Sequence, residues 1–160
     1  MERFNYDSSA GRLVYKIPPC QNQPQRVGQF AGGKHSEGGW IVSFKNSCYL
    51  HCRLVWMFVY GVDPEKMEID HINGDRSDDR IDNLRLATRQ QQQWNVAATA
   101  SNTSGYKGVG YYKRTGKWRA YIRKDNINKS LGYFNTKEDA YAAYVEASKQ
   151  LHGDFHRVKQ

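Results

Sequence analysis

The 160-residue sequence is poor in cysteine and contains no long hydrophobic run. Its three cysteines, Cys20, Cys48 and Cys52, include no Cys-x-x-Cys pair. This pattern argues against a disulfide scaffold or a four-cysteine zinc site and is typical of a reducing cytoplasm. The longest apolar run, residues 54–60, is too short to cross a membrane. Residues 1–12 also lack the basic-then-apolar pattern of a signal peptide, so the sequence predicts a cytoplasmic protein without membrane segments.

Composition and charge favour a globular chain with a polyanionic partner. Hydrophobic residues make up 39% of the chain and charged residues 25%, which is typical of one domain or two small ones with a buried core. Residues 1–100 hold 12 Lys and Arg against 11 Asp and Glu, a net charge of +1. Residues 101–160 hold 12 against 5, a net charge of +7. Charge alone leaves DNA, RNA, anionic lipid and a solvated basic surface open.

Alternating and turn-rich patterns predict short strands and two helices in the first hundred residues. The predicted strands are 12–17, 40–44, 47–50, 67–72 and 83–87. Residues 53–60 are predicted to form a helix that ends at Gly61. A second helix is predicted from a Thr88 cap to about Ala98. The small polar residues around 100–105 are the best linker candidate.

After this linker, the pattern predicts three strands and one amphipathic helix. The strands are 107–114, 117–124 and 129–134, with turns at 115–116 and 125–126. Thr136 and Asp139 form a capping-box pattern, and Gly153 marks the helix end. The predicted buried stripe is Ala140, Tyr144, Ala147 and Leu151. His152 and His156 are placed after the helix, where solvated or phosphate-contacting roles suit them.

Strand parity assigns a polar, basic face to this sheet. Trp118, Ala120 and Ile122 share one parity and suit packing under the helix. The opposite parity carries Lys117, Arg119, Tyr121 and Arg123, joined by Tyr112 and Arg114 from the preceding strand. Guanidinium groups bind phosphates and guanine edges, so this face suits DNA. The alternative is cation–aromatic pairing on a solvated sheet.

Motifs in this region resemble the AP2/ERF DNA-binding domain over residues 104–155. They are Tyr106-Lys-Gly-Val109, Gly116-Lys-Trp118, Ala120-Tyr-Ile-Arg123, Leu131-Gly132, Phe134-Asn-Thr136 and Glu138-Asp-Ala-Tyr141. The resemblance implies that the sheet lies in the major groove of double-stranded DNA. The contacts that it implies are Lys107, Tyr112, Arg114, Tyr121 and Arg123. Gly110 and Ser130 depart from the usual Arg and Trp.

The central segment Ile69-Asp-His-Ile-Asn-Gly-Asp75, followed by Ile81-Asp-Asn-Leu-Arg85, has residues suited to phosphodiester hydrolysis. A neutral histidine can take a proton from the attacking water, and a hard cation such as Mg²⁺ can stabilise the leaving oxygen. Mg²⁺ prefers oxygen ligands, so one Asp and an amide oxygen would suffice. Adjacent strand residues point to opposite faces, so Asp70 and His71 share a site only if the backbone turns or a ligand bridges them.

A wider set of motifs, spanning about residues 6–95, resembles HNH endonucleases of the phage and group I intron type. The motifs are Arg53-Leu-Val-Trp56, Gly61, Pro64, Ile69-Asp-His-Ile-Asn-Gly74, Arg80-Ile-Asp-Asn-Leu-Arg85 and Ala87-Thr88. The resemblance implies a ββα-metal fold with His71 as general base and Asp70 as metal ligand. It also implies that Asn83 holds the loop so that His71 is oriented.

Two positions depart from this family pattern. Gln92 stands where the family usually has an Asn as second metal ligand, and its amide oxygen lies one methylene further out. Asn95, one helical turn further along the chain, is the alternative candidate for the second metal ligand. A displacement of ~1 Å can lower a rate roughly 10²-fold. Cys52 stands where the family often has His before Arg53, and His51 lies one position early.

The predicted fold class is α+β with two modules. The predicted limits are an HNH domain at 1–98 with its ββα-metal core at about 67–98, a linker at 99–104, an AP2/ERF-like domain at 105–155 and a tail at 156–160.

The predicted function is a metal-dependent, phage-type or homing DNA endonuclease that acts in the host cytoplasm. The predicted cofactor is Mg²⁺, with Mn²⁺ as an alternative. The resemblance implies binding from the minor-groove side and hydrolysis of one strand at a time, leaving 5′-phosphate and 3′-hydroxyl ends. The alternative is a regulator that binds DNA through an HNH fold without catalysis, which Gln92 favours. RNA binding has little support, because no aromatic pair is spaced like an RNA-stacking platform. Monomer and DNA-assembled dimer both stay open.

Overall fold

The computed structural model describes residues 2–44, 47–96, 102–124 and 127–156. The chain divides into two compact units, Met1–Thr88 (unit 1) and Arg89–Gln160 (unit 2). Both contain small antiparallel sheets and α-helices, so the predicted α+β class is confirmed. Among the described residues, no helix has the length and apolar character needed to cross a membrane.

Unit 1 begins with a hairpin of β1 (Phe4–Asp7) and β2 (Arg12–Tyr15). β2 confirms the strand predicted at 12–17 but is shorter, whereas β1 was not predicted. The Asp7 carboxylate closes the turn by accepting hydrogen bonds from the backbone N–H groups of Ser9 and Ala10. Leu13 and Tyr15 alternate inward along β2 and enter the core of unit 1.

A three-stranded sheet follows, in the order β3 (Gly33–Lys34), β4 (Trp40–Phe44) and β5 (Ser47–Leu50). The hairpin predicted from 40–44 and 47–50 is confirmed, and its turn at 45–46 lies outside the described residues. Helix α1 (His51–Tyr60) starts directly after β5, two residues earlier than predicted. It ends as predicted at Gly61, whose left-handed φ of 72° lets its N–H reach the carbonyl of Met57.

The second hairpin of unit 1 consists of β6 (Glu68–His71) and β7 (Leu84–Ala87), with a 3-10 turn at Ile81–Asn83 between them. Both strands were predicted, and both are shorter than the sequence indicated. The register pairs Asp70 with Arg85 and His71 with Leu84. Ile69 and Leu84 pack with Leu13 and Val55 in the core, so the hairpin that carries Asp70 and His71 is fixed to both β2 and α1.

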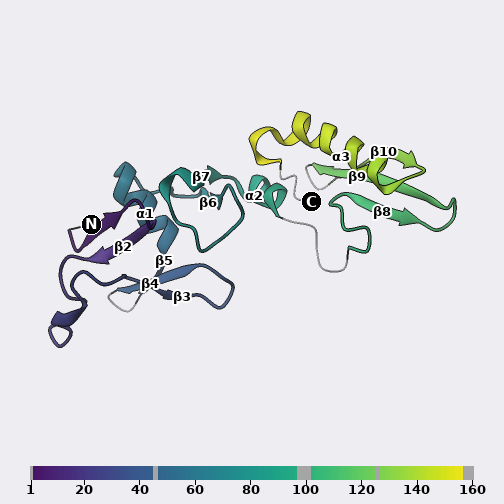
Figure 1. Ribbon diagram of the computed structural model, residues 1–160. Helices are drawn as coiled ribbons and strands as arrows, with labels where there is room; N and C mark the ends of the chain where they lie inside the picture. Colours follow the sequence, from purple (N-terminus) through teal and green to yellow (C-terminus); the bar gives the residue numbers. More distant parts are fainter. Residues whose placement is uncertain (1, 45–46, 97–101, 125–126, 157–160) are drawn as a thin grey trace. The chain divides into compact units, whose positions relative to one another are not determined.

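In unit 2, helix α3 lies along one face of a three-stranded sheet (Figure 1). The sheet order is β10–β9–β8, and the elements are α2 (Arg89–Asn95), β8 (Val109–Tyr112), β9 (Lys117–Lys124), β10 (Ile127–Phe134) and α3 (Lys137–His152). The prediction for β9 is confirmed. β8 is shorter than predicted, because Thr115 and Gly116 already turn back to the Tyr112 carbonyl. β10 begins two residues early, and the turn predicted at 125–126 lies outside the described residues.

The prediction for α3 is confirmed at both ends and corrected along its buried face. Thr136 accepts a hydrogen bond from the Asp139 N–H at 3.1 Å, and the Gly153 N–H closes the last turn. The buried positions are Ala140, Tyr144, Ser148 and His152 rather than a stripe through Ala147 and Leu151. The strict four-residue spacing keeps one line of side chains against the sheet.

His152 is therefore not a solvated residue beyond the helix. It is the last residue of α3 and is 6% exposed. Its ring stacks on Trp94 of α2 with centroids 4.4 Å apart. Burial is the main reason that its pKa is lowered.

Helix α2 ends at Asn95 and not near Ala98 as predicted. Lys107 Nζ donates hydrogen bonds to the carbonyl oxygens of Trp94 and Val96, both at 2.6 Å. A cation at the C-terminal end of a helix satisfies carbonyl groups that have no partner within the helix. The predicted residues 97 and 98, and linker residues 99–101, lie outside the described residues.

Candidate active site

Asn83 holds the loop that follows His71. Its Oδ1 accepts from the Asn73 N–H at 3.0 Å, and its Nδ2 donates to Asn73 Oδ1 at 3.0 Å and to the Asp78 carbonyl at 2.7 Å. Asn83 is 9% exposed, so these three bonds are largely shielded from water. The Asn83 side chain therefore links the two ends of the loop of residues 73–78. This arrangement fits the prediction that Asn83 holds the loop so that His71 is oriented.

Asp70 faces Arg85 across the β6–β7 hairpin. The Asp70 carboxylate is 3% exposed, and its Oδ2 accepts from Arg85 Nε and Nη2, both at 2.8 Å. A buried carboxylate needs such a charge partner because burial disfavours its ionised form. Arg85 therefore holds the carboxylate at the position predicted to bind a metal ion.

His71, at the end of β6, is directed to a different partner. Its Nε2 lies 2.7 Å from Oδ1 of Asp79, and His71 is 8% exposed. Asp70 and His71 therefore use separate partners, as expected for adjacent strand residues. When Nε2 donates its proton to the carboxylate, the lone pair of the neutral His71 ring is on Nδ1.

The opposite oxygen of Asp79 contacts a second histidine. Oδ2 of Asp79 lies 2.5 Å from Nδ1 of His51, the first residue of α1. The Nε2 of His51 accepts from the backbone N–H of Leu13 at 3.0 Å. Sequence reasoning missed Asp79 and did not connect His51 with His71. In the sequence, Asp79 is marked only by the adjacent carboxylate of Asp78. Polar loops commonly contain such pairs, so the pair did not indicate a functional role.

Cys52 lies beside this group of residues. A ligand atom from each of Cys52, His71 and Asp79 lies within 4.8 Å of the other two. Burial raises the pKa of the Cys52 thiol to about 12, and the negative charge of Asp79 adds to this shift. The thiol is therefore protonated at neutral pH, although thiolate is the form that binds metals.

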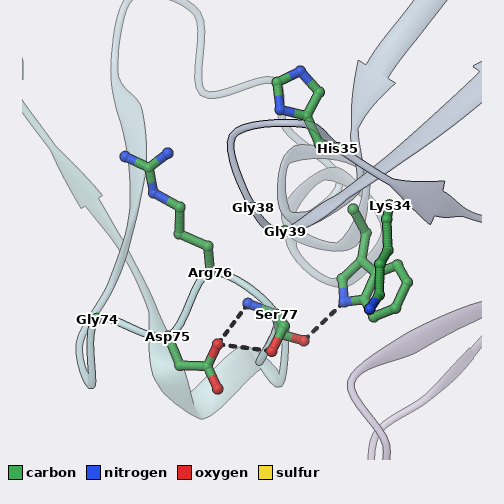
Figure 2. A pocket seen from close by; sticks show the side chains of 9 residues that line it. Lys34, His35, Gly38, Gly39, Gly74, Asp75, Arg76 and Ser77 are labelled. Atoms are coloured by element: carbon green, nitrogen blue, oxygen red, sulfur yellow. Dashed lines mark hydrogen bonds between the residues drawn. The ribbon is translucent and has the colours of Figure 1, made fainter.

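A pocket of about 340 Å³ lies next to the loop that Asn83 ties, between that loop and the β3–β4 turn. Figure 2 shows its lining residues, including Lys34, Arg76 and Ser77, and the hydrogen bonds from Ser77 to Asp75. Trp40 Nε1 donates to the Ser77 carbonyl at 3.0 Å. Lys34 and Arg76 bring two cations to this pocket, and the Trp40 contact fixes the loop after His71 to the neighbouring sheet.

The predicted metal ligands Gln92 and Asn95 both lie in α2, within unit 2. Gln92 is partly buried, and Asn95 is 5% exposed. Their predicted role stays a prediction, because it depends on an arrangement with Asp70 of unit 1.

The sheet of unit 2 exposes the predicted face opposite α3. Arg119 stands at its centre, paired with Gly110 on one side and with Tyr133 on the other. The rings of Tyr112 and Tyr133 lie 5.3 Å apart, and the Arg119 guanidinium lies 5.8 Å from the Tyr121 ring centre. Arg119 Nε is buried and has no hydrogen-bond partner among the described residues.

Most of the other predicted DNA contacts are exposed on this unit. Lys117, Tyr121, Arg123 and Arg114 are all exposed. Arg114 lies over the Tyr112 ring at 5.8 Å. Lys107 differs, since it contacts the end of α2.

Comparison with known proteins identifies the family. A family model for HNH endonucleases matches residues 48–94, which include Asp70, His71 and Asn83. Protein 3.8 of Escherichia phage T7 is 33% identical over 107 residues, covering 66% of this chain and 86% of the phage protein. The chain belongs to the HNH endonuclease family.

A second viral relative of this HNH chain carries the family in its name. The "Uncharacterized HNH endonuclease L560" of Acanthamoeba polyphaga mimivirus is 28% identical over 120 residues. The match covers 74% of this chain and 62% of the mimivirus protein. No solved structure matches the chain. The HNH match runs to Trp94 and so covers all of α2 except Asn95, which means that the family motif continues from unit 1 into the first helix of unit 2.

Proposed function

We propose that this protein is a metal-dependent DNA endonuclease of the phage HNH type, with His71 as its general base. The observation that supports this most is the pair Asp70 and His71 at the end of β6, each buried and each held by its own charged partner. His71 Nδ1 takes the proton of the attacking water, and Asn83 keeps the adjoining loop in place during the reaction.

The donor types of the predicted metal ligands are those that suit a Mg²⁺ ion. Asp70 offers a buried carboxylate oxygen, and Gln92 and Asn95 would add amide oxygens, all of the donor class that Mg²⁺ prefers, with Mn²⁺ as an alternative. A cation held there would stabilise the charge that develops on the leaving oxygen. Arg85 holds the Asp70 carboxylate in place for this role. Hydrolysis would leave 5′-phosphate and 3′-hydroxyl ends, one strand at a time.

We infer that unit 2 supplies the affinity for double-stranded DNA in the manner of an AP2/ERF-like domain. Its free sheet face carries Lys117, Arg119, Tyr121 and Arg123, and residues 101–160 hold a net charge of +7. Lys34 and Arg76 of unit 1 provide two further cations next to the loop that follows His71. The basic residues 101–160 would thus bring the nearly neutral residues 1–100, which contain Asp70 and His71, to DNA. The phage T7 relative supports action in the host-cell cytoplasm.

The rival function is a DNA-binding regulator without catalysis, which the Gln92 departure favours. The deciding experiment is Mg²⁺-dependent conversion of supercoiled plasmid to nicked or linear DNA by the full chain. His71→Ala and Asp70→Asn are assayed alongside, with EDTA as a control. Cleavage that is lost in both variants supports the endonuclease. DNA binding without any cleavage in Mg²⁺ or Mn²⁺ supports the regulator, and Gln92→Asn then tests whether the missing ligand is the reason.

A further inference from the structure

Asp79 lies between the rings of two buried histidines. We propose that Asp79, held in turn by His51, is a positioning residue that fixes the orientation and the proton location of His71. This inference rests on the proposed role of His71 as general base. The contacts that support it are Asp79 Oδ1 to His71 Nε2 at 2.7 Å and Asp79 Oδ2 to His51 Nδ1 at 2.5 Å.

The tautomer of His51 follows from the partners of its two nitrogens. The backbone N–H of Leu13 can only donate, so the His51 Nε2 that it contacts at 3.0 Å presents a lone pair. The proton of the neutral ring is therefore on Nδ1, where it is donated to Asp79. His51 is completely buried, so water does not compete for either nitrogen. His51 thereby fixes one oxygen of the carboxylate.

The proton of the neutral His71 ring is on the nitrogen that contacts Asp79. An ionised carboxylate only accepts hydrogen bonds, so His71 Nε2 must carry the proton that it shares with Asp79. Burial alone would raise the pKa of Asp79, but the hydrogen bonds from His51 and His71 outweigh it and leave that pKa lowered. The neutral His71 ring then presents its lone pair at Nδ1. An aspartate that selects the tautomer of a histidine base in this way is a known requirement of other hydrolases.

The backbone at Asp79 is held as closely as its side chain. Gly11, in the β1–β2 turn, has a left-handed φ of +63°, and a Cβ there would lie 2.6 Å from the Asp79 carbonyl carbon and 2.3 Å from the Arg80 N. Only glycine permits this approach. Asp79 is therefore clamped by β2 through Leu13 and His51, and by the β1–β2 turn through Gly11.

A metal ion held by Cys52, His71 and Asp79 is the competing explanation for the same cluster. Such an ion would have to displace the proton of the buried Cys52 thiol, because thiolate is the ligand form. It would also need Asp79 oxygens that already accept from two histidines. The hydrogen bonds among His51, Asp79 and His71 account for the close approach of Asp79 to both rings without an ion.

The first test locates the protons in the unmodified full-length protein. Long-range ¹H–¹⁵N correlation spectra, recorded at mildly alkaline pH, distinguish the two neutral histidine tautomers. The proposal predicts the Nδ1–H form for His51 and the Nε2–H form for His71. An Nδ1–H form of His71, or stoichiometric zinc whose removal shifts the His71 nitrogen signals, would overturn it. This result does not depend on cleavage, so it separates failure of this inference from failure of the proposed function.

The second test measures single-turnover cleavage and DNA binding by Asp79→Asn, with Asp79→Glu as the conservative variant. Asp82→Asn removes an exposed carboxylate of the neighbouring 3-10 turn and is the matched control. Asp79→Asn should lower the cleavage rate by on the order of 10²–10⁴-fold with little change in DNA affinity, and Asp79→Glu should recover part of the rate. Equal rates for Asp79→Asn and Asp82→Asn would refute a positioning role. If Asp79→Asn fails to fold, the tautomer spectra of the unmodified protein decide the question.

Discussion

The Nε2 atom of His71 lies 2.7 Å from Oδ1 of Asp79, which joins the end of β6 to the loop leading into β7. Through Asp79, His71 is also connected to His51 at the start of α1 and to Leu13 in β2. A local change in β2, in α1 or in the loop before β7 should therefore alter the position of His71, the proposed base.

Gly11→Ala should destabilise unit 1 and disturb the position of Asp79. The added Cβ meets the Arg80 N at 2.3 Å, and the residue must also keep a φ of +63°. A strained backbone of this kind costs about 1–3 kcal/mol, and the collision adds to that. Gly28→Ala is the control, because Gly28 has a φ of +79° but no atom within 4 Å of an added Cβ. Urea midpoints that fall equally in both variants would show that the close approach at Gly11 does not matter.

Asn83→Asp should loosen the loop that follows His71. The substitution keeps the size of the side chain but removes the two N–H donors to Asn73 Oδ1 and the Asp78 carbonyl. Loss of these buried partners should cost about 1–3 kcal/mol. Hydrogen exchange over residues 73–78 should become faster and cleavage slower. Asn22→Asp, at an exposed position, is the control. If hydrogen exchange over residues 73–78 were unchanged in Asn83→Asp, Asn83 would not hold this loop in place.

Lys117→Ala should weaken DNA binding and reduce its dependence on salt. Lys117 lies exposed on the sheet face opposite α3. Each phosphate contact contributes about 0.9 to the slope of log K against log salt, so loss of one contact should lower the slope by about that amount. Lys149→Ala removes an exposed lysine from α3 and should leave the slope unchanged. Equal slopes for the two variants would place DNA on a different surface.

Cys52 should resist alkylation in the folded protein, whereas Cys20 and Cys48 should react. Cys20 and Cys48 are exposed, while burial raises the pKa of Cys52 to about 12. A thiol with that pKa has a thiolate fraction on the order of 10⁻⁴ at pH 8. Mass spectrometry of peptides after brief iodoacetamide treatment, with and without urea, measures this directly. Rapid labelling of Cys52 without urea would contradict the buried, protonated thiol.

Much of the local structure could be predicted from patterns within a few residues of each other. The alternation in residues 40–50 indicated the β4–β5 hairpin, and the Thr136–Asp139 pattern indicated the start of α3. The His51–Asp79 contact could not be predicted, because it joins residues 28 positions apart and depends on how α1 packs on the β6–β7 hairpin. His152 was misplaced for a similar reason, since its burial depends on stacking with Trp94 of a different helix. Motifs within the sequence thus singled out Asp70, His71 and Asn83, but not the contacts of Asp79 with His51 and His71.

The most direct test of the endonuclease assignment combines single-turnover cleavage with DNA binding, both measured in Mg²⁺ on the full chain. The unmodified protein should bind DNA and cut it. His71→Ala should bind with the same affinity and cut on the order of 10²–10⁴-fold more slowly, because the group that takes the proton of the attacking water is lost. Tight binding without cleavage by the unmodified protein, or cleavage by His71→Ala at the unmodified rate, would contradict His71 as the base of a DNA endonuclease.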